Sequence, residues 1–272
     1  RLKMKLDTRR DTILSLLEKE GRVRVSQLSK QLGVSAVTIR ADLSKMEEEG
    51  LLKKVQGGAV QTTLSLYNHE FQRRRNLHQN AKMRIGTLAA DLINDGDSLF
   101  INGGSTTYYT ALELKKKQKL SVVTNALNVA IELAMCPSFS VILVGGTLNP
   151  YYSFMFGSDA LNQLRRYRVS KTILSIDGIS AQGITTIHPE EAAIVAAMIE
   201  RADHRMIVAD GSKIGNEGFV NICGLDKIDE LLTDETADRD ILDEIRAQNV
   251  NIHLSTSKGR YRYETTTENS IL

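Results

Sequence analysis

Three short segments combine glycine with hydroxyl, amide and charged side chains in a way that suits the binding of an anion. They are Asn102, Gly103, Gly104, Ser105, Thr106 and Thr107; Thr124 and Asn125; and Asp210, Gly211, Ser212 and Lys213. Glycines let the backbone turn its N–H groups toward an anion, and a helix that begins in the first segment adds its dipole. Lys213 can neutralise a phosphate group. Each segment alone is equally typical of a turn and a helix cap, so the prediction rests on all three occurring together.

A second group of polar residues lies near the N-terminus and suits contact with DNA. Its members are Ser35, Ala36, Thr38, Arg40, Ser44, Lys45, Lys53, Lys54, Gln56 and Gly57. Hydroxyl groups and helix N–H groups bind phosphate oxygens, whereas the guanidinium of Arg40 can bond to guanine O6 and N7. The small side chain of Ala36 allows the backbone to approach the duplex. Lys53 and Lys54 are expected to meet the adjacent DNA backbone or the minor groove.

Two short helices joined by a tight turn are expected in the middle of this region. Ser26 can cap the first helix, and Gly33 supplies the turn after it. Ser35 can cap the second helix, in which either Val37 or Ile39 faces inward. Such a pair is a helix-turn-helix, whose second helix enters the major groove with its N-terminus first.

Further elements complete an N-terminal domain. A helix that Asp7 or Thr8 can cap comes first and ends at Gly21, and a short extended segment follows it. Residues 51–61 predict a hairpin of two strands. This hairpin is the wing of a winged helix-turn-helix domain, which we expect to span residues 1–61.

In the remainder of the chain, helices alternate with short apolar strands. Strands are expected at residues 98–101, 121–124, 140–144, 171–176, 205–209, 231–232 and 250–254. This alternation predicts an α/β domain with a mainly parallel sheet, and ligands of such sheets bind at the carboxyl ends of the strands. The three anion-suited segments follow three of these strands. We expect a linker over 62–80, an α/β effector-sensing and oligomerisation domain over 81–255, and a disordered tail over 256–272.

The composition fits a DNA-binding protein of the cytoplasm. Residues 1–60 carry 13 Lys and Arg against 8 Asp and Glu, whereas the whole chain of 272 residues has 35 against 33. The excess of positive charge therefore lies in the N-terminal segment, as expected for a nucleic-acid-binding domain attached to another domain. No apolar stretch approaches the roughly 18 residues of a membrane span. Cys136 and Cys223 fit neither a disulfide nor a metal spacing and indicate reduced thiols.

The N-terminal region resembles the helix-turn-helix of the DeoR family of bacterial transcription regulators. The resemblance is carried by Arg9, Ile13, Leu17, Ser35, Thr38, Ile39, Arg40, Ala41, Asp42 and Leu43. The family usually has a second basic residue after the arginine and a His before the paired wing glycines, whereas this chain has Ala41 and Gln56 there. The resemblance implies binding to operator DNA, and the two departures imply an altered operator preference.

The larger domain resembles the sensor domain of the same family, which is related to ribose-5-phosphate isomerase and CoA-transferase-like folds. Besides the three segments above, the resemblance includes residues 145–148, 177–180, 183–185 and 191–192. It implies that Asp177 and Glu191, together with those segments, bind a phosphorylated sugar or sugar derivative that changes DNA affinity. The family commonly has Asp where this chain has Asn102, which implies a different preferred ligand or ligand protonation state.

An enzyme acting on a sugar phosphate is the main alternative. Such chemistry needs a carboxylate base and an acid or cation placed across a sugar carbon. Candidates by residue type are Asp177, Glu191, Asp210 and Lys213. However, Asn102 replaces a potential carboxylate, and the resemblance is to a sensor without turnover, so we predict no catalytic residues. His188 before Glu190 is typical of a helix start, so neither a metal nor another cofactor is predicted.

The sequence therefore predicts a transcription regulator that represses a carbohydrate-metabolism operon. We expect a homo-oligomer, dimer or tetramer, that binds double-stranded operator DNA and responds to a phosphorylated sugar. Two further alternatives stay open at this point. One is a regulator without small-molecule control, and the other is a winged helix used for protein contacts alone.

Overall fold

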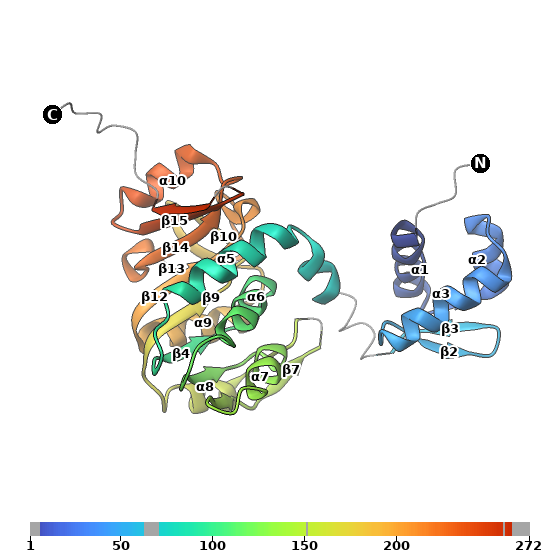
Figure 1. The fold of residues 1–272 in the computed structure, drawn as a ribbon, viewed down its shortest axis with the longest axis horizontal. Helices are drawn as coiled ribbons and strands as arrows, with labels where there is room; N and C mark the ends of the chain where they lie inside the picture. The colour runs from blue at the N-terminus through green and yellow to red at the C-terminus, as the bar shows by residue number, and fades with distance from the viewer. Residues whose placement is uncertain (1–5, 63–70, 151, 258, 263–272) are drawn as a thin grey trace. The chain divides into compact units, whose positions relative to one another are not determined.

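The computed structural model describes residues 6–62, 71–150, 152–257 and 259–262 (Figure 1). The chain divides into two compact units, with the boundary between Arg74 and Arg75. The part before this boundary, to which Pro150 and Tyr152 also belong, is the N-terminal unit, and the rest is the C-terminal unit. None of the helices in the described ranges combines the length and the hydrophobicity of a membrane span.

The N-terminal unit is a winged helix-turn-helix, as the sequence predicts. Its elements in chain order are α1 (Leu6–Glu20), β1 (Arg22–Arg24), α2 (Val25–Leu32), α3 (Ala36–Glu48), β2 (Lys53–Val55) and β3 (Gly58–Val60). The three strands form one antiparallel sheet in the order β1-β3-β2. The wing is thus paired with the strand that leads into α2, which ties it to the helix-turn-helix.

Buried side chains from all three helices form the core of this unit. Ile13, Leu28 and Ile39 are fully buried and belong to one cluster. Gly33 has a φ of +66°, a left-handed conformation that lets the chain turn between α2 and α3. Ile39 is therefore the inward residue of α3, and Val37, the other candidate, is 72% exposed.

Helix α2 begins two residues earlier than the sequence indicates, with Arg24 in the cap position in place of Ser26. Its first residue is Val25, and the expected cap Ser26 lies inside the helix. The backbone N–H of Val25 donates to the carbonyl of Gly57 at 2.9 Å. A backbone carbonyl of the wing thus accepts an N–H group at the start of the helix, where a capping side chain is otherwise common. Likewise α1 begins at Leu6, so the two residues expected to cap it lie within the helix.

An ion pair fixes α3 against α1. Arg9 Nε lies 2.6 Å from Asp42 Oδ2, and Arg9 Nη2 lies 3.0 Å from Asp42 Oδ1. Their side chains are only 11% and 7% exposed, respectively. A bidentate pair of this kind holds both orientation and distance, so it sets the position of the helix that carries Arg40.

The C-terminal unit is built on an eight-stranded sheet. The strands are β4 (Ser98–Ile101), β5 (Ser121–Thr124), β6 (Ser140–Leu143), β9 (Val169–Leu174), β12 (Ala202–Val208), β14 (Glu230–Asp234), β15 (Asn251–Thr256) and β16 (Gly259–Arg262). Their order is β16-β15-β14-β12-β9-β4-β5-β6. All neighbours pair in parallel except β15 and β16, which are antiparallel. The predicted mainly parallel α/β sheet is confirmed.

Helices cover both faces of this sheet (Figure 1). One hydrophobic cluster joins the sheet to α5 (Gln79–Asp91), α6 (Ser105–Leu114) and α7 (Leu127–Ala134). A second cluster joins it to α8 (Ser158–Leu164), α9 (Pro189–Glu200) and α10 (Arg239–Arg246). Strands buried on both sides are expected to be apolar along their whole length, and β4, with Leu99, Phe100 and Ile101 fully buried, has this character.

Several elements lie outside the sequence-based expectation. One is a small antiparallel sheet of β10 (Gly178–Ser180), β11 (Gly183–Thr186) and β13 (Val220–Cys223). Another is a separate hairpin of β7 (Thr147–Asn149) and β8 (Phe154–Phe156). Within the segment expected as a linker, residues 71–76 are helical. The main sheet also includes β16, which pairs with the edge strand β15. The domain therefore extends past residue 255, where the sequence predicts the start of a tail. Residues 63–70 of the expected linker and 263–272 of the expected tail lie outside the described residues.

The Arg9–Asp42 pair leads to a prediction about stability. Arg9→Met leaves the carboxylate of Asp42 buried without its partner, so the unfolding free energy of the N-terminal unit should fall by about 3 kcal/mol. Arg10→Met is the matched control, because Arg10 joins α1 to the end of α3 through Glu49 at 3.1 Å in a more exposed pair, and it should cost less than about 1 kcal/mol. Urea unfolding followed by circular dichroism measures both variants. Equal losses would contradict the role assigned to Arg9.

Candidate functional site

Helix α3 presents a polar face at its N-terminal half. Ser35 caps it, because its hydroxyl accepts the backbone N–H of Thr38 at 3.1 Å and lies 2.9 Å from the hydroxyl of Thr38. Arg40 and Lys45 are exposed on the same helix, whereas Ala36 and Thr38 are half-buried. The residues that the sequence assigns to DNA contact on this helix therefore share one structural element, with Ser35 acting also as its cap.

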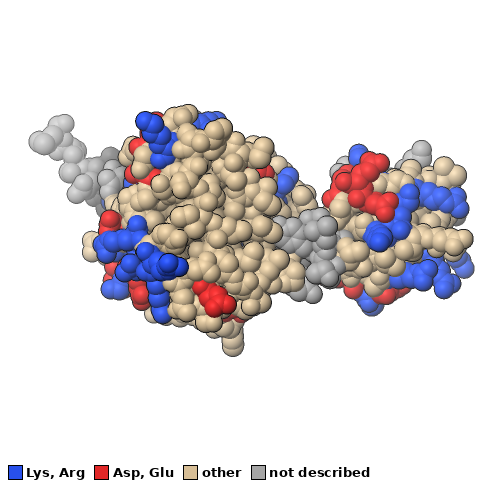
Figure 2. Space-filling view, turned by 90° about the horizontal axis from the view of Figure 1, so that it is seen from below, with Lys and Arg blue, Asp and Glu red and all other residues tan. Residues whose placement is uncertain are grey.

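The wing is fastened to α3 by Lys54. Its Nζ donates to Ser44 Oγ at 2.8 Å, and Ser44 in turn donates to the carbonyl of Arg40 at 2.9 Å. The backbone N–H of Lys54 donates to Glu47 at 2.7 Å. The other predicted wing residues, all exposed, are Lys53, Gln56 and Gly57. Figure 2 shows groups of Lys and Arg side chains on the surface of this unit, which suits contact with a polyanion.

The second site lies where the strand order of the main sheet reverses. From β4 the chain moves outward through β5 and β6, and it then returns to β9 on the other side of β4 before continuing through β12 and β14. In open α/β sheets, ligands bind outside the carboxyl ends of the strands at such a reversal. Asn102, Asp177 and Lys213 follow β4, β9 and β12. The topology therefore brings these predicted effector residues to one region of the sheet edge.

Asn102 joins the two strand ends at the reversal. It is fully buried. Its Nδ2 donates to the carbonyl of Ser175 at 2.9 Å, and its Oδ1 accepts the N–H of Ser175 at 2.8 Å. The same Nδ2 lies 3.4 Å from Oε1 of Glu191. An Asp at this position would lack the donor and would put a second carboxylate against Glu191, so the amide keeps one negative charge out of the site.

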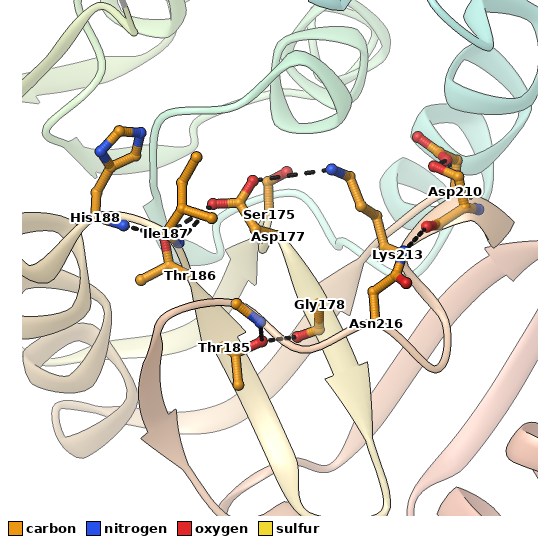
Figure 3. Close-up of polar contacts among 12 residues, drawn as sticks. Ser175, Asp177, Gly178, Thr185, Thr186, Ile187, His188, Asp210, Lys213 and Asn216 are labelled. Atoms are coloured by element: carbon orange, nitrogen blue, oxygen red, sulfur yellow. Dashed lines mark hydrogen bonds and ion pairs between the residues drawn. The ribbon is translucent and has the colours of Figure 1, made fainter.

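Two carboxylates share one hydroxyl group beside this junction, and Figure 3 shows one of them, Asp177, beside Thr186. Thr186 Oγ1 lies 3.0 Å from Asp177 Oδ2 and 3.0 Å from Glu191 Oε2. The backbone N–H of Ile187 also donates to Asp177, at 3.1 Å. Because a hydroxyl has one hydrogen, Thr186 donates to one carboxylate at a time. The pair thus presents several acceptor oxygens, which suits the hydroxyl groups of a polyol.

Two lysines accompany these acidic groups. Lys213 Nζ lies 3.8 Å from Asp177 Oδ1, and its side chain is 31% exposed (Figure 3). Lys82 Nζ lies 3.6 Å from Oδ2 of Asp210, and both of these side chains are almost fully buried. Asp210 also accepts the N–H of Ser212 at 3.1 Å, which holds the loop that carries Lys213. A buried charge needs a partner, so the Lys82–Asp210 pair ties this loop to α5.

The start of α6 forms the wall next to Asn102. A Cβ on Gly104 would overlap the side chain of Ser175, so only glycine allows α6 to begin this close to the end of β9. Thr107 Oγ1 donates to the carbonyl of Asn102 at 3.0 Å and is thereby used within the protein. The remaining predicted residues here, all buried, are Gly103, Ser105 and Thr106. The first-turn N–H groups of α6 lack acceptors inside the helix and favour an anion.

Tyr108 holds α6 against α7. Its hydroxyl donates to Glu132 Oε1 at 2.9 Å, and Lys115 pairs with the other oxygen of Glu132. Burial, followed by the hydrogen bond to Glu132, raises the pKa of Tyr108 to about 12. Burial alone would raise the pKa of Glu132, but the hydrogen bonds from Lys115 and Tyr108 lower it. The phenol therefore stays a donor and the carboxylate an acceptor, which fixes the helix that begins at the site.

Thr124 and Asn125 have different roles at the end of β5. Thr124 Oγ1 donates to the carbonyl of Ile101 at 2.6 Å and accepts the N–H of Ala126 at 3.0 Å, so it joins β4 to β5. Asn125 Nδ2 donates to the carbonyl of Met155 at 3.0 Å. Within the described part of the chain, the buried Oδ1 of Asn125 has no hydrogen-bond partner. Thr124 thus has a structural role, while Asn125 keeps an acceptor for a further donor.

Three residues of this region are absent from the sequence-based prediction. Ser175 and Thr186 belong to no motif that distinguishes them from other strand-end residues. For Lys82 a signal exists: it precedes the buried Ile85 by three residues and Ala89 by seven, the spacing of one helix face. A lysine on the inner face of an amphipathic helix indicates a buried partner, here Asp210.

Two family models match the chain. A model of the DeoR-like helix-turn-helix domain matches residues 9–63, and a model of the DeoR C terminal sensor domain matches residues 77–235. The second match alone covers more than half of the chain. Both matches coincide with the regions that carry the resemblance in the sequence.

Similar proteins cover nearly the same length. The chain is 33% identical over 234 residues to the HTH-type transcriptional repressor GlcR of Bacillus subtilis (strain 168), covering 85% of this chain and 90% of that protein. It is 33% identical over 232 residues to the Glycerol-3-phosphate regulon repressor of Escherichia coli (strain K12), covering 85% and 92%. Among solved structures, ribose 5-phosphate isomerase A from Neisseria gonorrhoeae matches with 14% identity and a TM-score of 0.40, covering 66% of this chain and 94% of that chain.

The two relatives are named as repressors and not as enzymes, which is the class that the sequence predicts. The winged helix-turn-helix and the α/β unit with its strand-end site agree with the two matching models in extent and order. The chain therefore belongs to the DeoR family of DNA-binding transcription regulators, with a DeoR-like helix-turn-helix domain followed by a DeoR C-terminal sensor domain.

Proposed function

We propose that this chain is a repressor of a carbohydrate operon whose affinity for DNA is set by a phosphorylated sugar or related polyol. The observation that carries the proposal is the meeting of Asn102, Glu191, Asp177 and Lys213 at the reversal of strand order. The relative named for the glycerol-3-phosphate regulon supports a phosphorylated polyol as the ligand class.

The chemistry of the site matches such a ligand in two parts. Lys213 and the first-turn N–H groups of α6 provide positive charge and donors for a phosphate. Asp177 and Glu191 provide acceptors for hydroxyl groups, and the buried Oδ1 of Asn125 provides another. Buried polar atoms are normally paired, so a ligand hydroxyl at Asn125 would satisfy an acceptor that the described residues leave without a donor. Because Asn102 carries a neutral amide in place of a carboxylate, the site repels a phosphate group less.

The same site is connected to the segment that leads into the N-terminal unit. The carbonyl of Leu77 accepts Lys82 Nζ at 2.7 Å, and the carbonyl of Arg75 accepts the hydroxyl of Tyr109 at 3.4 Å. The guanidinium of Arg75 also lies 5.3 Å from the ring centroid of Tyr108. Lys82 belongs to the pair with Asp210, and both tyrosines follow the first turn of α6. A ligand that favours one arrangement of these groups would change how they hold the Arg75–Leu77 segment.

The proposed regulator works in the cytoplasm as a homo-oligomer, a dimer or tetramer, with its operator presenting repeated half-sites to several winged helices. An effector changes DNA affinity only through different affinities for two arrangements of the protein. Here those arrangements differ in how the Arg75–Leu77 segment is held, and repression is relieved when the effector favours the arrangement unsuited to DNA.

A substitution in α3 tests the DNA-binding face. Arg40→Ala should weaken binding to the operator by about 1–3 kcal/mol, because an arginine that contacts a guanine supplies specificity of this size. Lys30→Ala, in an exposed position of α2, is the control and should change affinity little. Mobility-shift titrations with each protein measure the effect, and an unchanged titration for Arg40→Ala would remove Arg40 from the interface.

A substitution at the strand ends tests the ligand site. Lys213→Ala should abolish the thermal stabilisation of the protein by phosphorylated sugars, since the ammonium is expected to pair with phosphate, while binding to DNA without ligand stays intact. Lys227→Ala, a lysine whose side chain is 61% exposed, is the control. A screen of sugar phosphates by thermal shift identifies the ligand first. If Lys213→Ala also loses DNA binding without ligand, Lys213 has a structural role instead.

A third substitution separates ligand binding from its effect on DNA. Tyr109→Phe removes only the hydroxyl that bonds to Arg75, so ligand affinity should stay within about twofold while the ligand-induced change in DNA affinity shrinks by fivefold or more, which is about 1 kcal/mol of coupling. Tyr167→Phe, at a partly buried tyrosine elsewhere in this unit, is the control. Calorimetry with the ligand and DNA titrations with and without it give the two quantities. Equal coupling in both variants would exclude Tyr109 as the connection.

A further inference from the structure

The exposed apolar side chains of α3 carry a further inference. Val37 is 72% exposed in the first turn of the helix, whereas Ile39, two residues on, is fully buried. At about 100° per residue, these two side chains lie about 160° apart around the helix axis. Val37 is therefore directed away from the core of the N-terminal unit, at the end of the helix that enters a major groove first.

Val37 is not alone on this face. Ala41 is also exposed, and residues four apart lie about 40° from each other around the axis. Val37 and Ala41 thus form a short apolar strip along the exposed side of α3. Arg40 and Lys45, both exposed, border it on its two sides. The strip occupies the middle of the face that the polar residues would use to contact DNA.

An apolar strip in this position has one counterpart in the major groove. Of the four bases, only thymine presents an apolar group there, its C5-methyl, whereas the other bases present donors and acceptors at their edges. A strip of two small side chains is too small for a stable protein interface, which buries about 800 Å² on each partner. The basic residues around it favour a polyanion as the occupant. DNA therefore fits this face better than another protein does.

We propose that Val37, together with Ala41, contacts thymine methyl groups in the operator, next to the base that Arg40 contacts. The inference rests on DNA binding through α3 and adds which base it selects. The small side chain of Ala41 leaves room for a methyl group between helix and base. Desolvation of one methyl group against Val37 supplies discrimination of about fourfold, which corresponds to about 0.8 kcal/mol.

The test removes the methyl group from the DNA and the apolar group from the protein. Sequences bound by the full chain are first selected from a random pool of duplexes. Each thymine of the selected half-site is then replaced in turn by deoxyuridine, which keeps the base pair and lacks only the methyl. The wild-type protein should lose about fourfold in affinity at one or two of these positions. Val37→Ser should bind the unmodified duplex more weakly and should lose sensitivity at one of those positions.

Glu48→Ala is the matched control, because Glu48 is an exposed residue in the last turn of the same helix. It should keep the wild-type pattern of sensitivity to deoxyuridine. The inference is overturned if no replacement weakens wild-type binding, if Val37→Ser keeps the wild-type pattern, or if Val37→Ser changes only the oligomeric state measured by light scattering. Failure to select any sequence would instead contradict DNA binding itself, so the two failures are distinguishable.

Discussion

The reversal of strand order between β4 and β9 is the constraint on which the sensing half of the molecule depends. Loops that leave neighbouring strands in opposite directions open a polar crevice in an otherwise apolar sheet, and the backbone groups at its edges need partners. Asn102 meets this need by pairing with both the N–H and the carbonyl of Ser175. Its remaining contact reaches Glu191. Asn102, which joins the two strand ends, thus also positions the acidic side chain of Glu191.

Local chemistry explains what the sequence predicts well. Ser35 caps α3 through a hydroxyl only three residues from its target, so the motif and its geometry lie in one stretch of chain. The alternation of apolar strands and helices predicts the parallel sheet for the same reason, since each element shows its own periodicity. The strand-end positions of Asn102 and Lys213 could be predicted because a parallel sheet puts all its carboxyl ends at one edge, whereas Asp177 came from the resemblance to the family.

What the sequence leaves open depends on partners far along the chain. Helix α2 starts at Val25 because the carbonyl of Gly57 accepts its N–H, and no pattern around Ser26 contains that information. The strands of the small sheet have three or four residues each, too few to show a period. Lys82 meets Asp210 across 128 positions of sequence. Its place on the inner face of α5 could have been seen, but its partner could not.

The anchors of the Arg75–Leu77 segment have a consequence for how such regulators can be recombined. Two of them, from Tyr109 and Lys82, are accepted by main-chain carbonyls, which every amino acid possesses. The identity of the side chains in this segment is therefore secondary to its backbone path. A foreign winged helix joined immediately before Arg75, at the boundary between the two compact units, would retain both bonds. In the proposed regulator, the sensor domain is therefore a portable module that can be joined to different DNA-binding domains.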